Sequence, residues 1–147
     1  MERLIAAFAE PVTAAPLFFL MLDIDDFKKI NDNFGHDVGD QVLIDVATVL
    51  QQHCHGHNFV RLGGEEFAVT ARLTDVNAAR QLALDIVGTV NSSRMHGHSL
   101  SISVGLANHE SREAMSSLMR RADLALCYAK SQGKNRYAMA GRVALAV

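Results

Sequence analysis

The sequence lacks several features that would assign it to a common class of protein. It has only two cysteines, Cys54 and Cys127, without a Cys-x-x-Cys pair, which argues against a disulfide framework and for a reducing, cytoplasmic setting. Its formal net charge is −2 with no block of like charges, so the basic surface of a nucleic-acid or anionic-membrane binder is missing. The longest apolar stretch, residues 14–22, contains Pro16 and is too short to span a membrane. A small ligand or a protein partner is favoured.

The chain has enough hydrophobic sequence for one domain. Its 147 residues, 49% of them hydrophobic, can bury one substantial core and leave no room for two. No internal repeat or low-complexity linker interrupts the pattern, which predicts a single domain over residues 16–140. Residues 1–15 and 141–147 carry weaker signals, and we expect them to be loosely held ends.

Hydrophobic periods predict nine elements in the order β-α-α-β-β-α-β-α-β. The strands are expected at residues 17–22, 59–62, 67–72, 100–107 and 136–139. The helices are expected at residues 27–34, 42–53, 79–90 and 115–129, with a turn at residues 35–39. The strand at 100–107 alternates serine with apolar residues, which predicts a half-buried strand. The order fits an α+β fold, in which a central, mostly antiparallel five-stranded sheet is flanked by helices.

Acidic residues occur at two places that this fold would bring to one edge of the sheet. Asp23 and Asp25 end the first strand, and Glu65 and Glu66 lie in a tight glycine turn between two strands. Such carboxylates repel one another unless a cation neutralises them or some stay protonated. Oxygen ligands favour Mg²⁺ or Mn²⁺, whose shell is completed by water and phosphates. The alternative is that these acids are solvated, or that Asp25 or Asp26 caps the following helix.

Two phenylalanines and a histidine-rich run could suggest base stacking and zinc binding, but the sequence favours simpler interpretations of both. Phe27 and Phe34 lie on the apolar stripe of their helix, which predicts core residues rather than platforms for base stacking. The run His-Cys-His-Gly-His at residues 53–57 would splay its side chains apart if extended, and no fourth ligand is indicated. Zinc binding is therefore not favoured.

Three motifs resemble those of the GGDEF family in order and spacing. They are DIDDFKKIND at residues 23–32, GHDVGD at residues 35–40 and RLGGEEF at residues 61–67. The resemblance covers residues 17–137 and includes the SISVG strand at residues 101–105. It implies a nucleotidyl-cyclase-like fold of the ferredoxin or palm type. It also implies a diguanylate cyclase, which condenses two GTP molecules into cyclic di-GMP and two pyrophosphates.

The resemblance implies a metal site and the chemistry that it serves. Asp23, the main-chain carbonyl of Ile24 and Glu65 would hold two Mg²⁺ or Mn²⁺ ions per active site, with Glu66 supporting them or lying near a metal. The ions would lower the pKa of a ribose 3′-hydroxyl and stabilise charge at the α-phosphorus. Glu65 or Asp23 would accept the proton.

The resemblance also implies how GTP is bound. Asn31 and Asp40 would recognise guanine, because Asp40 can accept from the N1 and amino hydrogens that adenine lacks. The alternative for Asp40 is a helix N-cap. The expected triphosphate contacts are Lys28, which is also a catalytic candidate, and Lys130 and Lys134, although all three could be ordinary exposed lysines. The remaining expected substrate-binding residues are Phe27, His36, Gly63 and Gly64, whose glycines permit a tight turn and a close approach of backbone to phosphate.

The sequence departs from the family pattern at two places. Cys54 and His57 stand where many members carry an Arg-x-x-Asp product-inhibition site, so we predict little feedback inhibition through that site. The usual leading motif, Asp-x-Leu-Thr-Gly-Leu-x-Asn-Arg, does not occur in residues 1–15. We therefore expect an excised catalytic piece or a truncated relative.

The family resemblance implies that two domains, each with one GTP, face one another during catalysis. The chain has no heptad pattern, so we expect it to be mostly monomeric and slow in isolation, with dimerisation supplied by an upstream sensory or dimerisation module. Two alternatives stay open: a non-catalytic GTP-binding regulatory module, and a cyclase that acts on a single nucleotide.

Overall fold

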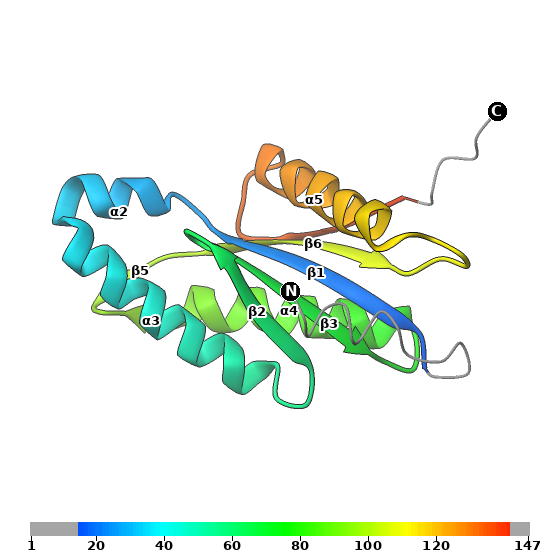
Figure 1. Cartoon of the computed structure of the whole chain (residues 1–147). Coiled ribbons are helices and arrows are strands. Elements are labelled where there is room, and N and C mark those ends of the chain that lie inside the picture. Colours follow the sequence, from blue (N-terminus) through cyan, green and yellow to red (C-terminus); the bar gives the residue numbers. More distant parts are fainter. Residues whose placement is uncertain (1–14, 142–147) are drawn as a thin grey trace.

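A computed structural model describes residues 15–141, which form a five-stranded sheet with helices on both faces (Figure 1). The sheet consists of β1 (Leu17–Ile24), β2 (Asn58–Gly63), β3 (Glu66–Arg72), β6 (Ile102–Asn108) and β7 (Tyr137–Met139). The helices of the described part are α2 (Phe27–Phe34), α3 (His36–His53), α4 (Val76–Ser92) and α5 (Met115–Ser131). The strand order is β2-β3-β1-β6-β7, and only β6 and β7 pair in parallel. The predicted α+β fold with a mostly antiparallel sheet is confirmed.

The central strand β1 is buried on both faces, which explains its continuous apolar sequence. Alternate side chains point to opposite faces of a strand, so Leu20 and Leu22 pack in the core beneath α3 and α4. Phe19 and Met21 pack on the other face, against Leu118 and its neighbours on α5. The strand is thus fixed between two cores, and the residues at its end have a fixed position.

The structure corrects three details of the predicted pattern. A small second sheet, β4 (Arg94–Met95) with β5 (His98–Ser99), precedes β6 and was not predicted. The strand β6 is buried along almost its whole length, not half-buried, because α4 covers one face and α5 the other. The helix α3 begins at His36, so the predicted turn at residues 35–39 is wrong and Gly35 alone separates α2 from α3.

The two phenylalanines of α2 have different environments. Phe27 is buried in the core, as predicted. Phe34 is 53% exposed, so its prediction as a core residue is wrong. Its ring lies 4.4 Å from the ring of His98 on β5, a partner that the sequence pattern did not indicate.

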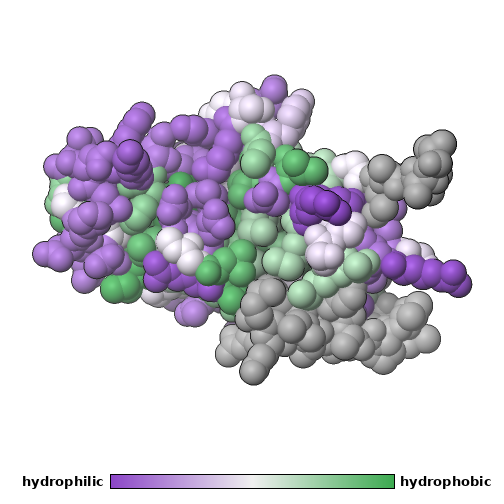
Figure 2. All heavy atoms as spheres, turned by 45° about the horizontal axis from the view of Figure 1, so that its top comes forward, coloured by the Kyte–Doolittle hydropathy of each residue, from purple (hydrophilic) through white to green (hydrophobic). Residues whose placement is uncertain are grey.

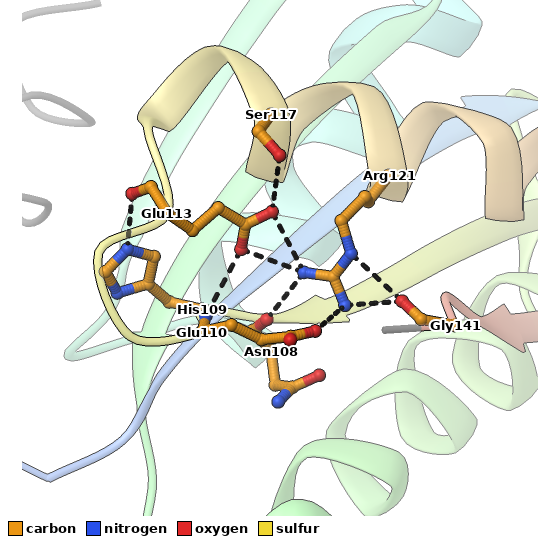
Figure 3. A network of polar contacts seen from close by, with 7 residues as sticks. All are labelled: Asn108, His109, Glu110, Glu113, Ser117, Arg121 and Gly141. Atoms are coloured by element: carbon orange, nitrogen blue, oxygen red, sulfur yellow. Dashed lines mark hydrogen bonds and ion pairs between the residues drawn. The ribbon is translucent and has the colours of Figure 1, made fainter. Parts of the chain in front are cut away.

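A buried arginine ties the loop after β6 to α5 and to the end of the described chain (Figure 3). Arg121 is paired with the buried carboxylate of Glu113 at 2.9 Å and with Glu110 at 2.9 Å. It also donates to the main-chain oxygens of Asn108 and Gly141. Because one guanidinium satisfies groups from three segments, this network holds α5 in place against the sheet.

Within residues 15–141, no helix combines the length and the hydrophobicity needed to cross a membrane. Both cysteines are free thiols, as predicted, with Cys54 buried and Cys127 exposed. The expectations for residues 1–14 and 142–147 lie outside the described residues and stay predictions.

Candidate functional site

The end of β1 and the tip of the β2–β3 hairpin meet at one edge of the sheet. Asp23 lies directly opposite Glu66 in the antiparallel register of β1 and β3. The next residue, Ile24, donates its N–H to the main-chain oxygen of Glu65 at 3.3 Å. Acids from two separate chain segments are therefore neighbours in space.

The hairpin tip is held by its own residues. Gly64 has a φ of +50°, a conformation that costs glycine little. Its carbonyl accepts a 3.0 Å hydrogen bond from Nε of Arg61, and the register between β2 and β3 shifts at this point. The turn leaves Glu65 half-buried and Glu66 exposed.

Asp23 is a partly buried acid with charged neighbours on both sides, Lys130 on one and the hairpin acids Glu65 and Glu66 on the other. Burial raises the pKa of its carboxyl from 3.8 to about 6; Lys130 opposes the rise, and Glu65 and Glu66 add to it. One carboxylate oxygen, Oδ2, lies 3.4 Å from Nζ of Lys130. The other, Oδ1, is buried and has no hydrogen-bond partner among the described residues. An unpaired buried carboxylate oxygen is unfavourable unless a cation or donor meets it, so this atom fits a metal ligand.

Asp25 does not join the expected cluster of four carboxylates. Its side chain is buried and hydrogen-bonded to Ser101, Ser103 and the main chain of Asn135. Within residues 15–141, no group of three or more His, Cys, Asp or Glu side chains is arranged to hold a metal ion. A metal at this edge would rest on few protein oxygens together with water and phosphates, which is the usual preference of Mg²⁺.

The zinc interpretation of the run at residues 53–57 has no support in the structure. His53 is the last residue of α3 and forms a 2.9 Å hydrogen bond with the hydroxyl of Thr89. Cys54 is buried, and its burial raises the pKa of the thiol to about 11, which disfavours the thiolate that zinc requires.

The capping alternatives for the acids after β1 are wrong. Asp26 stands before α2 but makes no side-chain capping hydrogen bond. Its carboxylate instead lies 2.6 Å from Nζ of Lys134, and this hydrogen bond is the main cause that lowers the pKa of Asp26 and raises that of Lys134. Lys28 is exposed on α2.

The residues expected to recognise guanine lie where α2 meets α3. The side chain of Asn31 covers Gly39, since a Cβ at Gly39 would lie 1.8 Å from Oδ1 of Asn31. Asp40 follows Gly39 inside α3, so its interpretation as a helix N-cap is wrong. A cavity of about 440 Å³ opens beside it. Its lining residues are Asp40, Leu43, Ile44, Ala47 and Arg61.

Sequence reasoning did not single out the other lining residues of this cavity. Leu43 and Ile44 stand three and four positions after Asp40, a spacing that places all three on one face of α3 and could have identified them. Arg61 reaches the cavity from β2, and only the fold shows that proximity. Of the other expected residues, His36 is the exposed first residue of α3, and the side chain of Phe27 is buried in the core.

The surface at this end of the molecule is hydrophilic. Figure 2 shows mostly hydrophilic residues over α2 and the beginning of α3, with hydrophobic side chains gathered toward the middle of the same face.

The fold and site together define an α+β domain that presents acids and lysines beside a glycine hairpin. The chain belongs to the family described as diguanylate cyclase, GGDEF domain, which matches residues 2–136. Two curated relatives are the diguanylate cyclases DgcP of Pseudomonas aeruginosa, 40% identical over 129 residues, and DgcM of Escherichia coli K12, 39% identical over 119 residues. These matches cover 84% and 80% of this chain but only 19% and 29% of the relatives.

Solved structures share the fold. The GGEEF domain of a diguanylate cyclase from Vibrio cholerae superimposes with a TM-score of 0.80 at 33% identity, covering 87% of this chain and 85% of that one. The GGDEF domain of DgcB from Caulobacter crescentus, solved in complex with c-di-GMP, superimposes with a TM-score of 0.83 at 32% identity. That match covers 93% of this chain and 84% of the other.

Proposed function

We propose that this chain is the catalytic domain of a diguanylate cyclase, which condenses two GTP molecules into cyclic di-GMP and two pyrophosphates. Family membership and the named relatives support the reaction. The observation that carries the proposal is the meeting of Asp23 with Glu65 and Glu66, where a buried oxygen of Asp23 has no partner among the described residues.

The proposed metal ligands are Asp23, the main-chain carbonyl of Ile24, Glu65 and Glu66, around two Mg²⁺ or Mn²⁺ ions. When bound, the ions would lower the pKa of the attacking 3′-hydroxyl and stabilise the charge that develops at the α-phosphorus. The residues present fit this role, because all the donors are hard oxygen ligands and Oδ1 of Asp23 is otherwise unsatisfied.

The chain's own residues bind and orient GTP in this proposal. Asn31 and Asp40 hold the guanine edge, and adenine is disfavoured because it lacks the N1 and amino hydrogens that the Asp40 carboxylate accepts. Lys28, Lys130 and Lys134 neutralise the triphosphate. The carboxylate of Asp23 or Glu65 takes the proton from the 3′-hydroxyl.

The reaction needs two such domains, because each binds one GTP and each 3′-hydroxyl attacks the nucleotide held by the other. The proposed partners are GTP, a second copy of the domain during catalysis, and an upstream sensory or dimerisation module in the whole protein. The proposed location is the cytoplasm, which supplies GTP and keeps both free cysteines reduced.

The test is to incubate the purified chain with GTP and MgCl₂ and to identify products by mass. Cyclic di-GMP is expected, at a rate that rises faster than linearly with protein concentration because two domains must meet. Glu65→Gln should abolish the product, whereas Asp123→Asn, which removes an exposed charge from α5, should not. Bound but unchanged GTP, or cyclic GMP as product, would contradict the proposal and favour a regulatory module or a single-nucleotide cyclase.

A further inference from the structure

Two consecutive acids after β1 form ion pairs with lysines from the end of α5, and Asp26 also lies 3.8 Å from Nζ of Lys29 on α2. Asp25 lies 3.6 Å from Nζ of Lys130, and Asp26 lies 2.6 Å from Nζ of Lys134. Both lysines come from the region where α5 ends, and both are proposed triphosphate contacts. The two ion pairs differ in exposure, because Asp25 is buried and Asp26 is exposed.

The Asp25 carboxylate is fixed by three hydrogen bonds. Its Oδ1 accepts from the hydroxyl of Ser103 at 2.7 Å, and its Oδ2 accepts from the hydroxyl of Ser101 at 2.7 Å and from the N–H of Asn135 at 2.9 Å. Asp25 is only 4% exposed, and Ser103 is fully buried. Because its donors come from the segment before β6, from β6 itself and from the turn after α5, the carboxylate cannot rotate away without breaking them.

Lys130 lies between two carboxylates that differ in freedom. Its Nζ is 3.4 Å from Asp23, whose Oδ1 is unpaired, and 3.6 Å from the fixed Asp25. A ligand that engages Asp23 would leave Lys130 anchored by Asp25 alone. In contrast, the Asp26–Lys134 pair is largely exposed, and an exposed pair exchanges easily for another anion.

We propose that Asp25 is a positioning residue, whose fixed carboxylate holds the Lys130 ammonium where it contacts the β- and γ-phosphates of GTP. The inference rests on the proposed function for the identity of the ligand. Asp25 itself touches neither substrate nor metal; it acts through Lys130, while Asp26 only occupies Lys134 until phosphate replaces it.

If Asp25 positions Lys130, replacing Asp25 should weaken ligand binding, although charge repulsion alone would make it stronger. Removing a negative charge beside an anionic ligand should strengthen binding. Asp26→Asn follows this rule and should bind the ligand as tightly as the wild type or more tightly. Asp25→Asn makes the same change of charge one residue away and should weaken binding, because Lys130 loses its anchor.

The experiment is calorimetric titration, in MgCl₂, with a GTP analogue that cannot be cleaved between the α- and β-phosphates. Asp25→Asn should weaken binding about tenfold, the loss expected when one charge-assisted phosphate contact is misplaced. Its affinity for GMP, which lacks the β- and γ-phosphates, should not change. In a Lys130→Met background, adding Asp25→Asn should have no further effect, because both changes remove the same contact.

Thermal unfolding identifies variants that fail to fold. If Asp25→Asn does not fold, Ser103→Ala removes one donor to Oδ1 and should still weaken analogue binding about threefold, as the loss of one hydrogen bond implies. The inference is overturned if the folded variant binds the analogue as tightly as the wild type, if GMP affinity falls equally, or if the wild type binds no analogue. If Asp25→Asn weakens analogue binding but the wild type makes no cyclic di-GMP, the positioning role of Asp25 is supported and the proposed cyclase activity is refuted.

Discussion

Replacing Asp23 with asparagine should stabilise the metal-free fold at neutral pH while removing activity. Burial raises the pKa of Asp23 to about 6 from 3.8, and the side chain is only 15% exposed. The folded chain therefore binds this proton more tightly than the unfolded chain does. That contribution to stability is fully present below pH 3.8 and is lost as the pH rises through 6. With about 1.4 kcal/mol for each pH unit between the two values, the loss is about 3 kcal/mol.

Urea unfolding of both proteins between pH 4 and pH 8, with a chelator present, measures this difference. Asparagine resembles the neutral carboxyl group, so the free energy of unfolding of the variant should exceed that of the wild type by only about 0.5 kcal/mol at pH 4 and by about 3 kcal/mol at pH 8. Mg²⁺ with a GTP analogue should then stabilise the wild type and not the variant, because a ligand stabilises only the state that binds it.

The control for this experiment is Asp123→Asn, which removes an exposed carboxylate from α5 and should leave the free energy of unfolding at pH 8 nearly unchanged. The reasoning is refuted if Asp23→Asn is no more stable than the wild type at pH 8. It is also refuted if the difference between the two proteins does not change with pH.

Three further outcomes are expected. Gly39→Ala should raise the KM for GTP about tenfold by displacing Asn31, whereas Gly88→Ala, whose new Cβ meets nothing within 4 Å, should leave KM unchanged and add up to about 1 kcal/mol of stability. Equal KM values for the two variants would contradict the role of Asn31. Arg121→Ala should lower the free energy of unfolding by about 3–5 kcal/mol, because it removes the only cation paired with the buried Glu113 carboxylate among the described residues. A loss below 1 kcal/mol in urea would count against that network. Cyclic di-GMP at low micromolar concentration should not suppress turnover, and noncompetitive inhibition in steady-state assays would show that a product site survives.

Much of the fold could be predicted because its signals are local. The continuous apolar run of β1 indicates a strand covered on both faces, and the glycine turn before Glu65 indicates a hairpin. The predictions of secondary structure and burial were wrong where contacts with distant residues, or very short strands, determine the structure. The alternating serines indicated a half-buried strand, yet Ser103 is buried because helices cover both faces of β6, and its hydroxyl is satisfied by Asp25. The β4–β5 hairpin has two residues in each strand, too few for a period to be detected.

For the site, the sequence predicted which residues take part but not which residues they contact. The family motifs located the acids and lysines by residue number, but they did not show what each acid contacts. The three hydrogen-bond donors to Asp25 lie 76, 78 and 110 positions away in the chain. Only the folded arrangement reveals that the Asp25 carboxylate is satisfied by these three donors, whereas Oδ1 of Asp23 has no partner among the described residues.

The most direct test of the account is a Mn²⁺ titration followed by electron paramagnetic resonance, in the presence of the non-cleavable GTP analogue. The wild type should bind Mn²⁺ at the edge formed by β1 and the hairpin, and Asp23→Asn and Glu65→Gln should each lose that binding while remaining folded. Wild-type Mn²⁺ affinity in either folded variant would show that these two residues do not share a metal site.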